Sequence, residues 1–107
     1  MRFEIVLAPA GAASFKALPA RTRASVRDAL ERHLRHEPTK TSKSRIKRLR
    51  GLQRPQYRLR VDEIRVFYDV TASTVEILAI IEKREAQGWL TESGTPGPNG
   101  GTGEGER

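Results

Sequence analysis

Apolar and polar residues alternate with a period of two in several separate parts of the chain. Phe3, Ile5 and Leu7 alternate in this way near the start, which is typical of a half-buried strand. The second half predicts three more strands, at residues 57–61, 64–70 and 74–81, separated by short polar stretches. We therefore expect one strand at the N-terminus and a run of strands later in the chain.

Between these strands the apolar spacing is that of helices. Residues 10–18 predict a short helix. Its apolar side is formed by Ala10, Ala13, Ala17 and Leu18. A second helix is predicted to begin at Pro19 and to end by Pro38, because proline suits a first helical turn and interrupts a helix interior. Its apolar side is formed by Val26, Ala29, Leu30, His33 and Leu34.

The order strand, two helices, then strands predicts an α+β domain. The two helices are expected to pack on one face of a mostly antiparallel sheet. Residues 1–92 form this single domain, in which residues 51–56 are an irregular connection and residues 82–92 form a short helix or a turn. Residues 93–107 contain six glycines and two prolines, a composition that predicts a disordered tail.

Composition limits the chemistry that the chain can perform. It has no cysteine and two histidines, too few for a convincing metal site, and His33 on an apolar helix side is given no role. We expect no metal and no cofactor. There is no apolar run of the roughly 20 residues that a membrane span needs and no leader peptide, so a cytoplasmic protein without a membrane partner is expected.

Charge is distributed unevenly along the chain. The formal net charge is +7, and residues 40–60 hold nine basic residues and no acidic one. Such a patch indicates a polyanionic partner, most often nucleic acid and sometimes an acidic protein segment or a membrane surface. The other interpretation is a solvated basic surface without a partner.

The predicted hairpin of residues 57–70 concentrates this charge. If Asp62 and Glu63 form the turn, Arg60 faces Arg65 across the two strands. One face then carries an apolar set, Tyr57, Leu59, Val61, Ile64, Val66 and Tyr68, and the other face carries Arg58, Arg60, Arg65 and Phe67. Like charges placed directly opposite each other destabilise a sheet, so their presence favours a phosphate-binding role.

In this interpretation the guanidinium groups bind phosphates and Phe67 stacks on a base. The nearby basic residues Lys47, Arg48 and Arg50 would hold the nucleic-acid backbone. The alternative is a surface ion-pair network, in which the arginines are neutralised by carboxylates on adjacent strands. The candidate carboxylates are Glu4, Glu76 and Glu82.

Four segments in order resemble the RelE/ParE superfamily of bacterial type II toxins: KRLRG (47–51), YRLRV (57–61), IRVFYDV (64–70) and EKRE (82–85). The resemblance covers residues 2–90. It implies a toxin that a cognate antitoxin holds inactive. RelE-like members cut messenger RNA, usually in the ribosomal A site and without a metal, by attack of the 2′-hydroxyl on the adjacent phosphate.

The resemblance also implies the catalytic residues. Arg58 and Arg60 stand where RelE-like members have lysines, and Arg65 and Arg84 stand at two arginine positions. A tyrosine near the C-terminus has no counterpart. Arginine is a poor proton acceptor at neutral pH, so the general base is left open among Glu82, Glu85 and Tyr68. Trp89 replaces the missing ring as an RNA-stacking surface or, with Leu90, anchors the C-terminal segment on the sheet.

The resemblance leaves three functions open. The first is a messenger-RNA endoribonuclease whose partners are the antitoxin, messenger RNA and the ribosome. The second is a ParE-like inhibitor of DNA gyrase. The third is a catalytically inactive relative that binds the antitoxin, or operator DNA through the antitoxin complex. Fold similarity alone does not choose among them.

Overall fold

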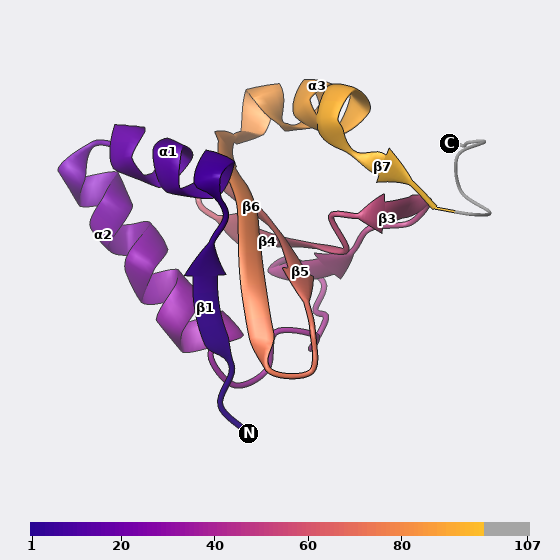
Figure 1. Cartoon of the computed structure of the whole chain (residues 1–107). Coiled ribbons are helices and arrows are strands. Elements are labelled where there is room, and N and C mark those ends of the chain that lie inside the picture. Colours follow the sequence, from indigo (N-terminus) through magenta and orange to yellow (C-terminus); the bar gives the residue numbers. More distant parts are fainter. Residues whose placement is uncertain (98–107) are drawn as a thin grey trace.

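A computed structural model describes residues 1–97, and Figure 1 shows the arrangement. Helices and strands are grouped in separate runs along the chain, as expected for an α+β domain. In chain order the elements are β1 (Glu4–Leu7), α1 (Pro9–Ala17), α2 (Ala20–Ala29), a π-helical turn (Leu30–Leu34), β2 (Ile46–Arg48), β3 (Leu52–Arg54), β4 (Tyr57–Val61), β5 (Ile64–Val70), β6 (Thr74–Glu82), α3 (Lys83–Ser93) and β7 (Thr95–Pro96). No helix in the described residues is long and apolar enough to cross a bilayer.

The main sheet has five strands in the order β1-β6-β5-β4-β2. Strand β1 runs parallel to β6, and the other neighbours are antiparallel. The predicted fold class, with a mostly antiparallel sheet, is therefore confirmed. The predicted hairpin and the strand that follows it agree with β4, β5 and β6 to within one residue at their ends.

Helices α1 and α2 lie on the same side of the sheet (Figure 1), as predicted. The side chains of Val26, Leu30 and Leu34 are buried against the apolar face of β4 and β5. Tyr68 is fully buried on this face, and its hydroxyl donates a hydrogen bond of 2.7 Å to the carbonyl of Pro38. The helical spacing of the second helix thus identified its buried face correctly.

The predicted apolar side of the first helix is wrong for its three alanines. Ala10, Ala13 and Ala17 are exposed, and Gly11 is buried instead, whereas Leu18 packs against the core as predicted. A Cβ atom on Gly11 would lie 2.3 Å from the carbonyl oxygen of Ile77, so the absent side chain allows the backbone of α1 to approach β6 closely. Counting alanines as apolar could not detect a contact made by a missing side chain.

The C-terminal segment also differs from the prediction. Helix α3 and strand β7 extend the ordered structure beyond residue 92, because β7 pairs with β3, within the stretch predicted to be irregular. In Figure 1 α3 lies on the opposite side of the sheet from α1 and α2. The rest of the predicted tail, residues 98–107, lies outside the described residues.

Candidate nucleic-acid interface

The β4–β5 hairpin has the register that the sequence predicts. Arg60 pairs with Arg65 and Arg58 pairs with Phe67. Asp62, in the turn, adopts a φ of 52°, in the left-handed region that aspartate tolerates better than most residues. Because alternate residues of a strand point to opposite faces, Arg58, Arg60 and Arg65 lie on the face away from α1 and α2.

Arg65 is held in place by the backbone of the hairpin. Its side chain is largely buried, with 7% of its surface exposed. The Nη1 atom donates hydrogen bonds to the carbonyl oxygens of Asp62, at 2.8 Å, and Ile64, at 3.0 Å. These acceptors orient the guanidinium without neutralising its charge, so Arg65 is a fixed and uncompensated cation.

Arg58 adds a second constrained cation, and Lys47 lies beside it. Lys47 pairs with Arg58 across β2 and β4, which places both side chains on the same face. The Nε atom of Arg58 is buried and has no hydrogen-bond partner among residues 1–97. Burial lowers the pKa of Arg58, and the positive charges of Arg65 and Arg60 lower the pKa further, although a guanidinium remains protonated at neutral pH. We call Lys47, Arg58, Arg60 and Arg65 the arginine cradle.

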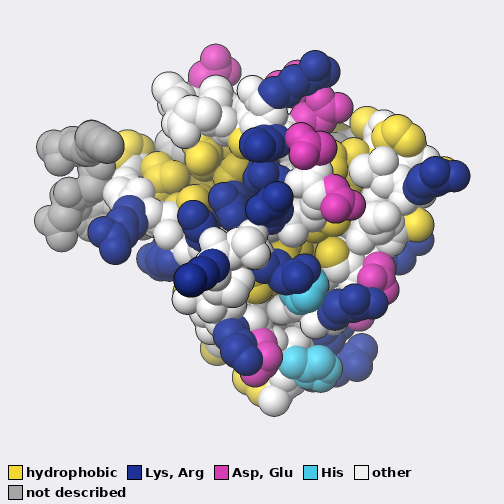
Figure 2. Space-filling model, turned by 180° about the vertical axis from the view of Figure 1, so that it is seen from behind, with side chains coloured by type: hydrophobic (Ala, Val, Ile, Leu, Met, Phe, Trp, Pro, Cys, Tyr) yellow, Lys and Arg dark blue, Asp and Glu magenta, His cyan; other side chains and the backbone are white. Residues whose placement is uncertain are grey.

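The alternative prediction, an ion-pair network on this face, is not what the structure shows. Glu76 binds Arg54, at 3.2 Å, and Glu82 binds Arg84, at 2.9 Å. Among residues 1–97, no ion pair includes a residue of the arginine cradle. Seen from behind, Lys and Arg side chains gather in the middle of the molecule, next to hydrophobic side chains (Figure 2).

Three of the predicted basic residues do not join the cradle. Arg48 pairs with Tyr57 and therefore lies on the opposite face of β2, where its guanidinium stacks 5.2 Å from the centre of the Tyr57 ring. Arg50 is exposed in the turn after β2. Arg84 begins α3, with 80% of its side chain exposed, and pairs with Glu82. The three residues share a positive charge but not a place: strand alternation turns Arg48 to the other face, Arg50 lies in a turn and Arg84 lies in a helix.

Phe67 is not an exposed surface for base stacking, which corrects the prediction. Its ring stacks on that of Trp89, with 5.0 Å between the centres and 16° between the planes, and only 1% of the residue is exposed. Trp89 therefore anchors α3 on the sheet, the second of its two predicted roles. This contact covers the apolar part of the basic face; Lys47 and Arg60 stay exposed on that face, Arg58 is half-buried and Arg65 is buried.

The three candidate bases are now distinguished. Tyr68 is on the helix-covered face, and burial raises its pKa well above the usual value, so it cannot accept a proton in the cradle. Glu82 is engaged by Arg84. Glu85, exposed in the first turn of α3, has no ion pair within the described residues.

Arg45 also lies beside the cradle, although its charge alone did not mark it as a site residue. Its carbonyl oxygen accepts a hydrogen bond of 2.8 Å from the amide of Arg60, so the chain before β2 continues alongside the cradle. Charged and apolar residues alternate in Arg45-Ile46-Lys47, as in a strand. This alternation could have predicted that Arg45 lies beside the cradle. No group of three or more His, Asp or Glu side chains suited to a metal ion occurs in residues 1–97.

No protein-family model matches this sequence, and no curated protein matches it. Solved structures do resemble it. A chain of the toxin–antitoxin complex RelBE2 from Mycobacterium tuberculosis superimposes with a TM-score of 0.63 at 22% identity, covering 77% of this chain and 99% of its own length. A chain of the archaeal RelE–RelB complex from Pyrococcus horikoshii superimposes with a TM-score of 0.58 at 24% identity, covering 78% of this chain and 97% of its own length.

A chain of the RelB–RelE antitoxin–toxin complex from Methanococcus jannaschii gives a TM-score of 0.54 at 16% identity and covers 79% of this chain and 98% of that one. All three structures therefore match over almost their full length. This chain shares its fold with one chain of each of these three complexes. The structural match confirms the resemblance that the sequence suggested.

Proposed function

We propose that the chain is the toxin of a type II toxin–antitoxin pair and that it cuts messenger RNA without a metal ion. The observation that carries this proposal is the arginine cradle, whose four cations share one face and form no ion pair within the described residues. Repulsion among them costs stability. A bound polyanion relieves that repulsion.

The cradle is suited to stabilising a phosphate whose charge increases during reaction. In the proposed step, the 2′-hydroxyl attacks the adjacent phosphorus in line, and the 5′-oxygen of the next nucleotide leaves. The products are a 2′,3′-cyclic phosphate and a 5′-hydroxyl. Arg65, fixed by two carbonyls, and Arg58, with its unpartnered Nε, stabilise the pentacoordinate phosphate. Arg60 and Lys47 orient the strand.

The proton of the 2′-hydroxyl needs an acceptor, and arginine is a poor one. We assign this role to Glu85, the candidate base that keeps a carboxylate without an ion pair in the described part of the chain. Arg84, at the start of α3, lies outside the cradle and holds Glu82. In this proposal Arg84 contacts the leaving strand and Arg50 holds more distant backbone, whereas Arg48, on the opposite face of β2, does not contact the strand.

The proposed partners follow from the charge of this face and from the structural relatives. The relatives were solved as toxin–antitoxin complexes. An acidic antitoxin segment placed over the cradle would exclude RNA, which explains how a partner keeps such a toxin inactive. In this proposal the free protein binds messenger RNA positioned by the ribosome, and the complex with antitoxin binds operator DNA.

The test is induction of the free chain followed by mapping of cellular transcripts by primer extension. We expect growth arrest and cuts that leave 5′-hydroxyl ends, both in cells and when the purified protein is assayed on programmed ribosomes. Arg65→Ala should abolish the cuts. Because Arg65 also supports the hairpin turn, Arg58→Gln provides a second variant, and circular dichroism verifies that both fold.

The matched control is Arg21→Gln, which removes an exposed arginine from α2 and should cut normally. A folded Arg65→Ala protein with full activity would refute the assignment of the site. Intact transcripts together with trapped gyrase–DNA breaks would replace the proposed enzyme by a ParE-like inhibitor. Growth arrest with neither effect would exclude both functions.

A further inference from the structure

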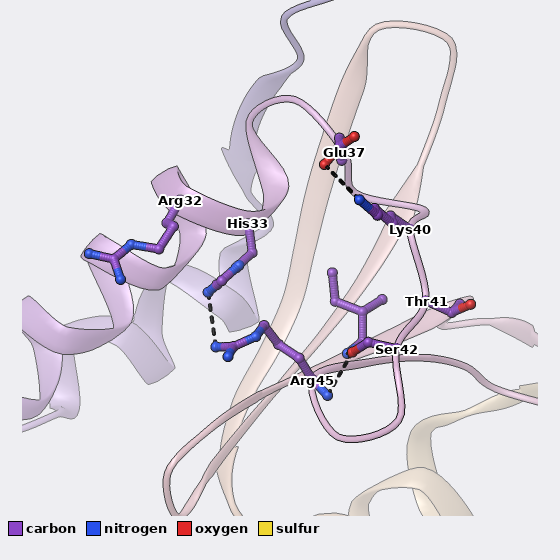
Figure 3. A pocket seen from close by; sticks show the side chains of 8 residues that line it. Arg32, His33, Glu37, Lys40, Thr41, Ser42 and Arg45 are labelled. Atoms are coloured by element: carbon purple, nitrogen blue, oxygen red, sulfur yellow. Dashed lines mark hydrogen bonds and ion pairs between the residues drawn. The ribbon is translucent and has the colours of Figure 1, made fainter.

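A second polar site lies outside the arginine cradle. A cavity of about 220 Å³ opens between the π-helical turn and the loop that leads into β2 (Figure 3). Three cationic side chains and one carboxylate line it, together with hydroxyl groups. The lining residues are Arg32, His33, Glu37, Lys40, Thr41, Ser42, Arg45 and Ile46. Arg32 is paired with Asp28, at 3.3 Å, and Lys40 with Glu37, at 3.7 Å, so the positive charge that stays unpaired within the described residues is that of Arg45.

Arg45 and His33 point toward each other in this cavity (Figure 3), with 3.0 Å between Nη1 of Arg45 and Nε2 of His33. A guanidinium has only donors, so Nε2 must accept and the ring is neutral, with its proton on Nδ1. Arg45 has no ion pair among the described residues. The remaining N–H groups of the pair are therefore donors that no carboxylate neutralises.

The loop on the other side of the cavity is closed by its own hydrogen bonds. The Oγ atom of Ser42 accepts from the amides of Arg45, at 3.0 Å, and Ile46, at 3.3 Å. The amide of Ser42 donates to the carbonyl of Ile46, at 2.9 Å. Since Oγ acts as the acceptor in these contacts, its proton is left to donate. The donors are thus held in place before any ligand arrives.

The helix that carries His33 is irregular at this point. Residues Leu30–Leu34 form a π-helical turn, and such turns are rare and often occur at functional sites. The site is also continuous with the cradle, because the amide of Arg60 donates to the carbonyl of Arg45 and paired chains lie about 4.8 Å apart. In Figure 2 the Lys and Arg side chains of this face continue toward the histidines.

We propose that this cavity binds a backbone phosphate of the RNA strand that the arginine cradle holds, at a nucleotide beyond the scissile bond. This inference rests on the proposed function and adds a second phosphate site to it. Donors outnumber acceptors in the cavity, which suits a phosphodiester. At about 220 Å³ it is smaller than the roughly 300 Å³ at which pockets for drug-sized ligands begin, so it fits a phosphate and part of its sugar.

The experiment compares two fluorescent single-stranded RNAs by anisotropy, a trinucleotide that occupies the cradle alone and a decanucleotide that can reach both sites. Arg45→Gln should weaken decanucleotide binding about tenfold, as expected for one charge-assisted contact, and leave trinucleotide binding unchanged. Glu37→Gln, at an exposed position that does not threaten folding, should strengthen decanucleotide binding severalfold. Arg21→Gln, at the far end of α2, is the control.

The outcomes separate this inference from the proposed function. If Arg65→Ala weakens both RNAs and Arg45→Gln weakens neither, the cradle binds RNA and the second site does not exist. Equal weakening of both RNAs by Arg45→Gln also contradicts a separate site. If Arg65→Ala affects neither RNA, the proposed RNA-binding function itself fails, whatever Arg45→Gln does. A Glu37→Gln protein with unchanged affinity for the decanucleotide counts against the inference even if Arg45→Gln misfolds.

Discussion

Replacement of Arg60 by glutamine should make the protein more stable and a weaker RNA binder. Arg60 is exposed on β4 and directly faces Arg65. The substitution keeps a long polar side chain at the edge of the cradle and removes one of two opposed charges. Folding then no longer has to bring these charges together, whereas a bound phosphate loses a contact. The substitution should therefore raise the free energy of unfolding and lower the affinity for RNA.

The gain in stability can be estimated from like-charge pairs in sheets, which cost from a few tenths to about 1 kcal/mol. We expect a gain of about 0.5 kcal/mol, because Arg60 is screened by solvent while Arg65 is buried. For a domain of this size such a gain raises Tm by about 2–4 °C. The gain should shrink as salt is added, since salt screens the repulsion that the substitution removes.

The loss of binding can be measured as a change in salt dependence. If all four cradle cations contact phosphates of a single strand, log K falls with log salt with a slope of about −2.8, at about 0.7 for each contact. Arg60→Gln leaves three contacts and a slope of about −2.1. Urea and thermal unfolding would measure stability, and anisotropy with a single-stranded RNA at several salt concentrations would measure the slope.

Arg21→Gln serves again as the control, because it removes one charge of the same kind from an exposed part of α2. It should change neither Tm nor the slope appreciably. A destabilised Arg60→Gln protein would mean that the guanidinium makes favourable contacts that the repulsion argument omits. A slope equal to that of the wild type would show that Arg60 contacts no phosphate.

Three further predictions test the packing around the site. Gly11→Ala should destabilise the fold by about 1–3 kcal/mol, since its Cβ would collide with the backbone of β6. A Cβ atom at Gly88 would meet nothing within 4 Å, so Gly88→Ala should stabilise α3 by up to about 1 kcal/mol. Urea unfolding of both variants measures the two changes in stability. Trp89→Ala should cost about 2 kcal/mol through loss of the stack on Phe67 and increase hydrogen exchange in α3, while unchanged exchange would contradict the anchoring role. Burial, followed by the charges of two neighbouring arginines, lowers the pKa of His33 below 6.5. As the pH drops below about 6.5 the unfolded chain binds a proton at this residue before the folded chain does, so the free energy of unfolding falls. This part of the fall should be absent in His33→Gln, and identical pH profiles of stability for the two proteins would refute the lowered pKa of His33.

The hairpin shows how much local pattern can predict. Alternation from Tyr57 to Val70, interrupted by Phe67, and a two-residue turn leave one register that gathers the arginines on one face, and the structure has that register. The apolar face of α2 was equally readable, because helical spacing and flanking prolines mark it. In both segments the decisive residues are neighbours in sequence.

The errors arose where distant segments meet. The charge of Arg48 suggested a place beside Lys47, but the pairing of β2 with β4 sends the two side chains to opposite faces. The exposure of Phe67 depended on α3, whose docking position the sequence did not indicate. Arg45 and His33, twelve residues apart, meet only because the loop between them folds back.

The sequence by itself therefore determined β1, the second helix and the strands of the hairpin and β6, the register of the hairpin and the concentration of positive charge, because these follow from side-chain periodicity and composition within a few residues; β3 and β7 were missed. Only the tertiary structure decided which cations remain without a carboxylate, which aromatic ring is covered and where a second polar cavity opens. Those properties depend on burial and on contacts between segments far apart in the chain, and one-dimensional spacing does not record either.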